Sequence, residues 1–276
     1  MKIIVALLGS LAISSLGFAG ESSNLVSYNI RFAAKTDLGT RAWDARKEQV
    51  ATYLSESKCD IFGLQEVLQH QLLHVQKALP EYRYIGVGRE DGKTKGEYCP
   101  LFYDLAKWTA DTDEQGTFWL SETPDIPGST SWGNEIPRVC SWARLVNKEG
   151  KGIYVYNNHF DHQSQNSREQ SAVLMLKKIK ERKHLKEPVV VMGDLNAYTT
   201  NPAIKTLLEP GDFIDHGGAK QMSTSSRWLP ALVPGMRIDH IFTSPGVKVK
   251  EFKVESNGDP VAGSDHHPVI LRGVAF

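Results

Sequence analysis

The distribution of apolar and polar residues predicts strands that alternate with helices at both ends of the chain. Apolar runs rich in β-branched or aromatic residues at 24–31, 59–66 and 189–196 predict buried strands. Apolar residues at helical spacing predict helices from about 43 to 57 and over 167–183. Strand, helix and strand in succession are typical of a layered α/β fold.

The middle of the chain differs, because strands follow one another there without helices. Antiparallel strands inside an α/β chain predict either one mixed sheet or two sheets packed face to face. The strands of this region are expected at 98–103, 117–120, 138–146 and 152–160. Elsewhere we expect a strand at 82–88, a helix through Leu72, Val75 and Leu79, a short helix at 202–208, strands at 236–242 and 247–254, and a last strand directly after the Asp265-His266 pair.

Polar side chains stand at the ends of several of these strands. The strand at 189–196 ends in Gly-Asp-Leu-Asn, and both Asp194 and Asn196 are also common turn formers. The recurrence of the pattern favours a site, since loops at strand ends carry chemistry on a rigid scaffold. The strand-end polar residues are Asn29, Glu66, His159, Asp161, Asp194, Asn196, Asp239, Asp265 and His266.

These residue types indicate a metal-dependent hydrolase. Carboxylate and amide oxygens suit hard cations such as Mg²⁺ or Mn²⁺. The chain has neither the His-Glu-x-x-His motif of a zinc site nor the Gly-x-Ser-x-Gly elbow of a serine hydrolase. Hydrolysis by activated water is therefore predicted, with a phosphate ester as the target whose charge a metal and an imidazolium stabilise.

Composition limits the partners of this site. The 276 residues, 41% of them hydrophobic, suffice for one large domain, and the formal net charge is zero. A dedicated nucleic-acid binder usually carries a basic stripe, which this chain lacks, although a nuclease is not excluded. Of the three cysteines, Cys59 is expected to be buried, and Cys99 and Cys140 are candidates for a disulfide between neighbouring strands.

The first 20 residues have the pattern of a signal peptide. Lys2 precedes an apolar run that ends in small residues, with Gly17 and Ala19 before a possible cleavage point. We therefore expect export to the periplasm or the medium, and a mature domain over 21–276. No later stretch has the apolar length of a membrane span, so stable membrane insertion is not expected.

Six motifs, in order along the chain, resemble those of the endonuclease/exonuclease/phosphatase superfamily, which includes DNase I. The resemblance runs from about Leu25 to Leu271, nearly the whole of the expected mature chain. A bacterial branch of that superfamily is the nearest in pattern. The motifs are Ser-Tyr-Asn-Ile-Arg at 27–31, Leu-Gln-Glu-Val at 64–67, Asn-His-Phe-Asp-His at 158–162, Gly-Asp-Leu-Asn at 193–196, Arg-Ile-Asp-His-Ile at 237–241 and Ser-Asp-His-His-Pro at 264–268.

The resemblance implies a four-layer α/β sandwich, in which two mixed sheets pack face to face between helices. It also implies the site residues. Glu66 would be the main metal ligand, with Asn29 and Asp265 nearby. In catalysis, Asp194 would activate the attacking water, and Asn196 would bind that water or a phosphate oxygen. His266, oriented by Asp239, would bind the phosphoryl group or act as a general acid. His159 would stabilise charge on the phosphoryl group.

Substrate contacts are predicted less sharply. Asp161 either lines the site or binds a loop amide. Arg168 in a first helical turn opposes the helix dipole, and Arg89 lies in a polar loop, so both are candidate anion contacts. We expect a monomer that hydrolyses a phosphate mono- or diester of a small molecule. The alternatives are a secreted nuclease of the same fold and a non-catalytic binding module.

Overall fold

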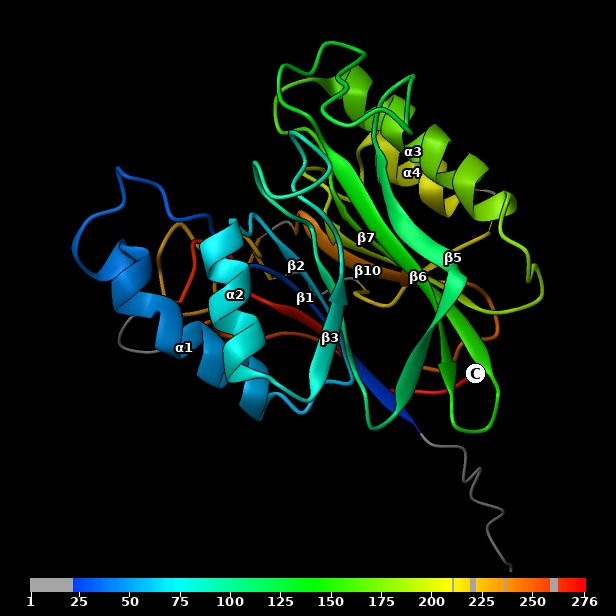
Figure 1. The fold of residues 1–276 in the computed structure, drawn as a ribbon, viewed down its shortest axis with the longest axis horizontal. Helices are drawn as coiled ribbons and strands as arrows, with labels where there is room; N and C mark the ends of the chain where they lie inside the picture. The colour runs from blue at the N-terminus through cyan, green and yellow to red at the C-terminus, as the bar shows by residue number, and fades with distance from the viewer. Residues whose placement is uncertain (1–21, 210, 219–221, 236, 259–262) are drawn as a thin grey trace, which may run out of the picture.

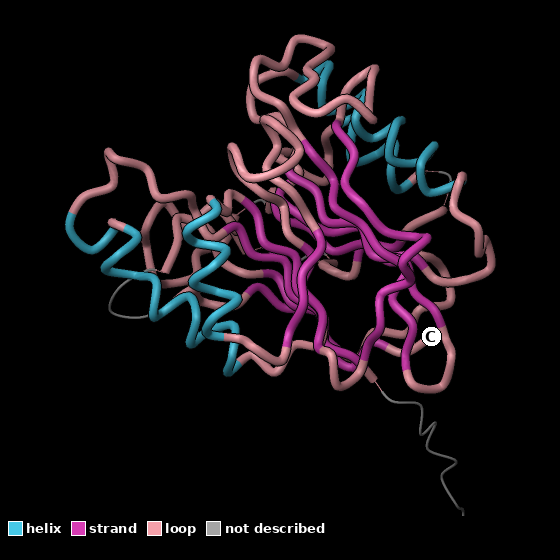
Figure 2. Tube along the Cα trace, viewed as in Figure 1, coloured by secondary structure: helices cyan, strands magenta, loops and turns pink. Residues whose placement is uncertain are grey.

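The computed structural model describes residues 22–209, 211–218, 222–235, 237–258 and 263–276. Over these ranges the chain forms two six-stranded sheets that pack face to face, with helices on both outer faces (Figures 1 and 2). The predicted four-layer α/β sandwich is thus confirmed. The expected signal peptide at 1–20 lies outside the described residues.

The first sheet is built around a parallel pair of strands from the N-terminal part of the chain. β1 (Ser23–Asn29) runs parallel to β2 (Ile61–Gln65), and all other pairs in this sheet are antiparallel. The order is β11-β12-β1-β2-β4-β3. The remaining bounds are Tyr82–Ile85 for β3, Leu101–Asp104 for β4, Glu251–Val254 for β11 and Val269–Val274 for β12.

The second sheet has the same plan. β7 (Gly152–His159) runs parallel to β8 (Val189–Asp194), and its other pairs are antiparallel. The order is β5-β6-β7-β8-β10-β9. The remaining bounds are Trp108–Trp119 for β5, Val139–Asn147 for β6, Ile214–Asp215 for β9 and Asp239–Thr243 for β10.

Helices cover the outer faces of the two sheets (Figure 1). α1 (Trp43–Glu56) and α2 (Gln69–Ala78) bury apolar residues against the first sheet, after a short 3₁₀ turn at Gly39–Arg41. α3 (Gln165–Lys180) and α4 (Pro202–Leu208) do the same on the second sheet. No helix in the described part of the chain is long and apolar enough to span a bilayer.

A buried amide pair joins the two sheets near the ends of β2 and β7. Gln65 Nε2 donates to Asn157 Oδ1 over 2.8 Å, and Asn157 Nδ2 donates to the carbonyl oxygens of Leu64 and Pro100, at 2.9 Å each. Gly63 makes the room, because a Cβ there would overlap the Asn157 side chain. Below this pair the inter-sheet space is filled mainly by apolar residues, so these directional hydrogen bonds help to fix how the sheets dock, although Gln65 Oε1 has no partner among the described residues.

Some predicted bounds were wrong. β5 was expected only at 117–120, yet it begins at Trp108, because residues 111–115 of this edge strand are polar and interrupt the register, with Thr112 and Asp113 exposed and Glu114 buried. The strand expected at 247–254 begins only at Glu251, whereas the last strand follows the Asp265-His266 pair as predicted and begins at Val269. The cysteines Cys99 and Cys140 are both buried and free, and Cys59 is buried as expected.

The buried imidazole of His240 predicts acid sensitivity of the fold. Its Nε2–H donates to the Ala197 carbonyl over 2.8 Å, and burial, aided by the nearby Arg237, lowers its pKa from 6.5 to about 4. Between these values the unfolded chain binds a proton that the folded chain does not. The free energy of unfolding is therefore expected to fall by about 3 kcal/mol as the pH drops through this window. Above pH 6.5 the imidazole is neutral in both states, and its full contribution to stability is present.

Urea unfolding at a series of pH values measures this effect. The His240→Gln variant keeps a donor for Ala197 but does not titrate. We expect its stability to depend less steeply on pH between 6.5 and 4 than that of the wild type. Equal slopes for the two proteins would show that His240 does not carry the dependence.

Candidate active site

The strand-end polar residues of both sheets meet at one edge of the sandwich. In each sheet the carboxyl ends of the parallel pair point the same way, which brings Asn29 beside Glu66 and His159 beside Asp194. Asn29 Nδ2 then reaches across the sheets to Asp194 Oδ2 over 3.0 Å. The convergence that the sequence predicted is therefore present, with contributions from both sheets.

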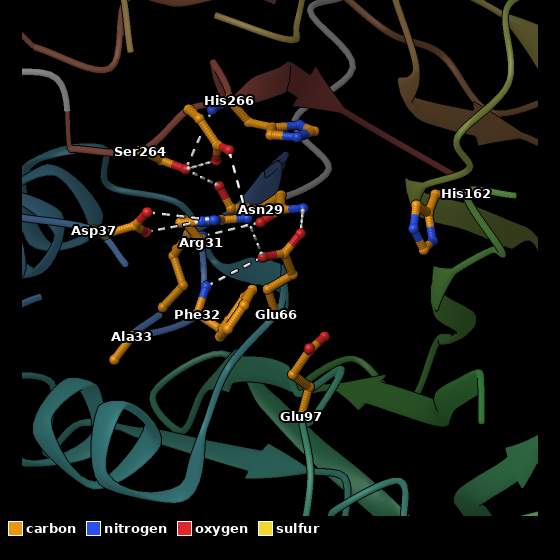
Figure 3. A network of polar contacts seen from close by, with 12 residues as sticks. Asn29, Arg31, Phe32, Ala33, Asp37, Glu66, Glu97, His162, Ser264 and His266 are labelled. Atoms are coloured by element: carbon orange, nitrogen blue, oxygen red, sulfur yellow. Dashed lines mark hydrogen bonds and ion pairs between the residues drawn. The ribbon is translucent and has the colours of Figure 1, made fainter. Parts of the chain in front are cut away.

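Glu66 is held by the first sheet and the loop after β1. Its Oε1 accepts from Asn29 Nδ2 over 3.0 Å, and its Oε2 accepts from the Phe32 N–H over 3.2 Å. Figure 3 shows Asn29, Arg31 and Glu66 together below Ser264 and His266, whereas Glu97 and His162 lie apart from this group.

Asn29 presents its amide nitrogen to the site. Its Oδ1 accepts from the Arg31 N–H over 2.9 Å, while its Nδ2 bridges Glu66 and Asp194. In this arrangement Asn29 orients two carboxylates and offers no oxygen inward. Its predicted role as a direct metal ligand stays a prediction.

His266 and Asp239 form a buried ion pair. His266 Nδ1 donates to Asp239 Oδ2 over 2.9 Å, which orients the imidazole and leaves Nε2 3.8 Å from Asp194 Oδ2. Burial opposes the charge on the imidazole, but Asp239 and Asp194 outweigh it and hold the pKa of His266 well above its usual value. The pairing that the family resemblance implied is thus present, with a protonated imidazole at neutral pH.

Asp194 is the central carboxylate. It is buried, accepts from the Asn196 N–H over 3.0 Å, and lies 3.6 Å from His159 Nε2. Burial, with the negative charge of Asp239, raises its pKa to about 7, although His266 opposes this shift. A carboxyl group with a pKa near neutrality is suited to accept a proton from water. The Asn196 side chain is tied to the Phe160 carbonyl over 3.1 Å.

His159 lies beside a buried arginine that the sequence analysis missed. Arg138 Nη1 lies 3.2 Å from His159 Nε2, and its Nη2 lies 2.8 Å from His162 Nδ1. Burial first, and then the charge of Arg138, hold the pKa of His159 well below its usual value. The imidazole is therefore neutral at pH 7, and it would stabilise phosphoryl charge by hydrogen bonding and not by a charge of its own.

Asp161 organises the loop after β7. Its Oδ1 accepts the N–H groups of Gln163 and Ser164 at 2.9 and 2.7 Å, and its Oδ2 accepts from Arg138 Nε over 3.4 Å. Of the two roles considered for Asp161, the binding of loop amides is confirmed. The bound carboxylate in turn positions the Arg138 guanidinium.

The two arginines proposed as anion contacts are both engaged within the protein. Arg89 is buried in a bidentate pair with Glu97, at 2.7 and 2.8 Å. Arg168 donates to the Asp161 carbonyl over 2.8 Å and to the Gln165 side chain. In this structure both arginines bind neighbouring protein groups beside the site, and their contact with substrate stays a prediction.

The backbone turns sharply where the strands deliver these side chains. Arg31, Glu66 and Asn196 have φ values of 56°, 60° and 47°, a region that non-glycine residues rarely adopt. Such strain persists where the surroundings determine it, and it gathers at functional sites. Gly193, just before Asp194, has no alternative, because a Cβ there would overlap the Asn158 carbonyl of the neighbouring strand.

The donor set fits a divalent cation. One oxygen or nitrogen from each of Glu66, His159 and Asp194 lies within 4.8 Å of the others. The neighbouring cations Arg89, Arg138, Arg31 and His266 are each paired with another carboxylate, namely Glu97, Asp161, Asp37 and Asp239. Glu66 and Asp265 share Arg31 at 3.8 and 3.9 Å, and Asp194 lies 3.8 Å from His266, so these three carboxylates have only longer contacts with cations that are already paired, and the site favours added positive charge.

Arg138 is predicted to matter for turnover. Arg138→Gln removes the donors to His159 and His162 and leaves Asp161 without its counter-charge, so we expect kcat/KM to fall about 10–100-fold, as for other residues that orient catalytic groups. Arg144→Gln is the matched control, since Arg144 lies on β6, the strand that Arg138 precedes, in an ion pair with Glu187. Similar activity in both variants would contradict the assignment, and melting temperatures would show whether both fold.

Comparisons with known proteins agree with this geometry. The model of the endonuclease/exonuclease/phosphatase family matches residues 26–266. No curated protein matches the chain. Among solved structures, a mannosyl-6-phosphatase of Bacteroides thetaiotaomicron is 35% identical, with a TM-score of 0.85 over 92% of this chain and 100% of that one.

Two further structures extend the comparison. An endonuclease/exonuclease/phosphatase family protein of Bacteroides thetaiotaomicron is 35% identical, with a TM-score of 0.84 over 93% of this chain and 98% of that one. The human Nocturnin catalytic domain, solved with bound sulfate, is 17% identical, with a TM-score of 0.69 over 92% of this chain and 95% of that one, and it shows the fold alone. The chain belongs to the endonuclease/exonuclease/phosphatase family, whose members are hydrolases of phosphoester bonds.

Proposed function

We propose that this chain is an exported, Mg²⁺-dependent phosphatase that hydrolyses a phosphate monoester of a small molecule. The observation that carries the proposal is the position of Asp194 between an imidazolium and an amide donor. Its Oδ2 lies 3.8 Å from the protonated His266 and 3.0 Å from the Asn29 amide that also holds Glu66.

The side chains divide the reaction between them. Asp194 holds the attacking water and accepts its proton, in an orientation that the Asn196 N–H and Asn29 fix. His266 places positive charge on a phosphoryl oxygen, and Asp239 keeps it protonated and oriented. A divalent cation held by Glu66, with Asp194 and Asp265 close by, would stabilise the charge that develops on the phosphoryl group.

Two observations favour a small phosphate monoester over nucleic acid. The chain has no net charge, whereas contact with a phosphate backbone usually needs a run of unpaired basic residues. A relative with 35% identity is described as a mannosyl-6-phosphatase, which makes mannose 6-phosphate the first substrate to test. Mg²⁺ is preferred to softer ions because most of the donors are oxygens.

The test is a panel of substrates with a defined metal. Purified protein would be incubated with mannose 6-phosphate, p-nitrophenyl phosphate, bis-p-nitrophenyl phosphate, plasmid DNA and single-stranded RNA, with Mg²⁺, with Mn²⁺ and after chelation. We expect monoester hydrolysis that stops on chelation and returns with Mg²⁺. Preferential cleavage of DNA or RNA, with a steep salt dependence, would instead support the nuclease alternative.

Export and a monomeric state are parts of the same proposal. The leader-like pattern at 1–20 supports export, and cleavage after Ala19 is expected. N-terminal sequencing of the protein from the periplasmic or extracellular fraction would read the cleavage point directly. Light scattering of the same preparation would give the oligomeric state.

A further inference from the structure

A cavity of about 380 Å³ lies beside the His266–Asp239 pair. This volume lies in the range of about 300–1,000 Å³ that is usual for sites of small ligands. The cavity is formed by the loop after β8, the segment 223–235 and the residue before β10. Its lining includes Tyr198, Ser223, Ser225, Arg227, Leu229 and Ile238.

The cavity walls are joined directly to the catalytic residues. Ile238 immediately precedes Asp239, and Ser225 pairs with His266 in an antiparallel bridge. The N–H groups of Ser226 and Arg227 both donate to the Asp265 carbonyl, at 2.7 and 3.1 Å. A molecule whose phosphate lies at His266 therefore has this cavity next to it.

The segment that carries Arg227 is held in place by contacts within the protein. The adjoining Trp228 ring lies under two guanidiniums, with Arg41 5.7 Å and Arg46 5.4 Å from its centre. Arg46 is fully buried and donates to the carbonyls of Ile30 and Gly263. These contacts stabilise a backbone in which Arg227 and Trp228 both have positive φ, at 51° and 67°.

The lining has the chemistry of a site for a polyhydroxylated ring. Tyr198 is 46% exposed, and its aromatic face is available to the apolar side of a sugar. Arg227 is exposed, and its guanidinium makes no ion pair or hydrogen bond with any residue that the structure describes. A free guanidinium supplies several donors in a fixed geometry, which suits neighbouring hydroxyl groups, and Ser223 and Ser225 add hydroxyls to the wall.

We propose that this cavity binds the sugar part of a sugar phosphate while the phosphate is hydrolysed at Asp194 and His266. Tyr198 packs against the ring, and Arg227 binds its hydroxyl groups. The inference rests on the proposed phosphatase function, and it adds the class of alcohol that leaves. One unpaired arginine in a cavity of this size does not suit an extended polyanion, which needs a continuous basic track.

The test compares a substrate that fills the cavity with one that does not. The kcat/KM for mannose 6-phosphate would be divided by that for methyl phosphate, in the wild type and in Tyr198→Ala and Arg227→Gln. We expect this ratio to fall about tenfold or more in each variant, because contacts with the sugar are lost while the phosphate contacts are shared by both substrates. Arg83→Gln, at an exposed arginine on β3, is the matched control and should keep the wild-type ratio.

The outcomes separate the two proposals. Hydrolysis of methyl phosphate with an unchanged ratio in both variants overturns the sugar subsite and leaves the phosphatase function standing. No hydrolysis of any monoester by the wild type overturns the phosphatase function and the inference with it. Saturation-transfer NMR with free D-mannose gives a readout without turnover: the transfer seen with the wild type should weaken in Tyr198→Ala, and equal transfer would count against the subsite.

Discussion

Replacing Asp194 by Asn is expected to lower kcat about 10²–10⁴-fold, the range for loss of a positioned general base. The amide keeps the size of the carboxylate but cannot accept a proton from the attacking water. The Asn196 N–H still finds an oxygen acceptor, but the new amide nitrogen then faces the Asn29 Nδ2 donor, so the hydrogen bond between these two side chains is lost. The measurement is the initial rate on the best monoester, together with a thermal melt that shows whether the variant remains folded.

A buried carboxylate of the first sheet, at the end of β2 opposite the site, provides the control. Asp60 accepts the Asn24 N–H over 2.8 Å and pairs with Lys107, just before β2 begins. Asp60→Asn should lower the melting temperature without a comparable loss of kcat. If Asp194→Asn kept more than about a tenth of the wild-type kcat, general-base catalysis by Asp194 would be ruled out.

His266 and Asp239 are expected to act as one unit. His266→Gln removes the imidazolium, and Asp239→Asn removes the carboxylate that orients it and keeps it charged. Each substitution should lower kcat about 10²–10⁴-fold. The double variant should be no slower than His266→Gln alone, because groups that act together lose their effect together.

A double-mutant cycle measures this coupling. Rates of the wild type, both single variants and the double variant would be compared on the same substrate and metal. Multiplicative losses would mean that Asp239 acts on substrate or metal independently of His266. That outcome is a real alternative, because Asp239 Oδ1 is buried, has no hydrogen-bond partner among the described residues, and could therefore contact substrate or metal directly.

The strand-end rule accounts for most of what the sequence predicted correctly. Polar residues directly after apolar runs met in space because each sheet contains a parallel pair whose carboxyl ends coincide. The rule also explains why Arg138 was missed. It immediately precedes β6, and in an antiparallel pair the start of one strand lies beside the end of the next, here near His159. A search of strand starts opposite strand-end histidines would have found it.

Other features depend on packing that a one-dimensional pattern does not record. The amide orientation of Asn29 follows from the Arg31 N–H, which accompanies the turn after β1. The inter-sheet pair of Gln65 and Asn157 needs the space left by Gly63 on a strand distant in sequence. The polar edge strand β5 lacks the apolar alternation of buried strands, so only its C-terminal part was predicted.

The amide pair between the sheets has a consequence for how the enzyme loses activity. Glu66 and Asp265 come with one sheet and Asp194 and Asp239 with the other, so each sheet carries an incomplete set of catalytic groups. Any sliding or parting of the sheets would separate base from metal ligands while both sheets kept their own hydrogen bonds. Turnover is thus a sensor of inter-sheet docking, and on heating it should vanish before the far-ultraviolet signal of the strands does.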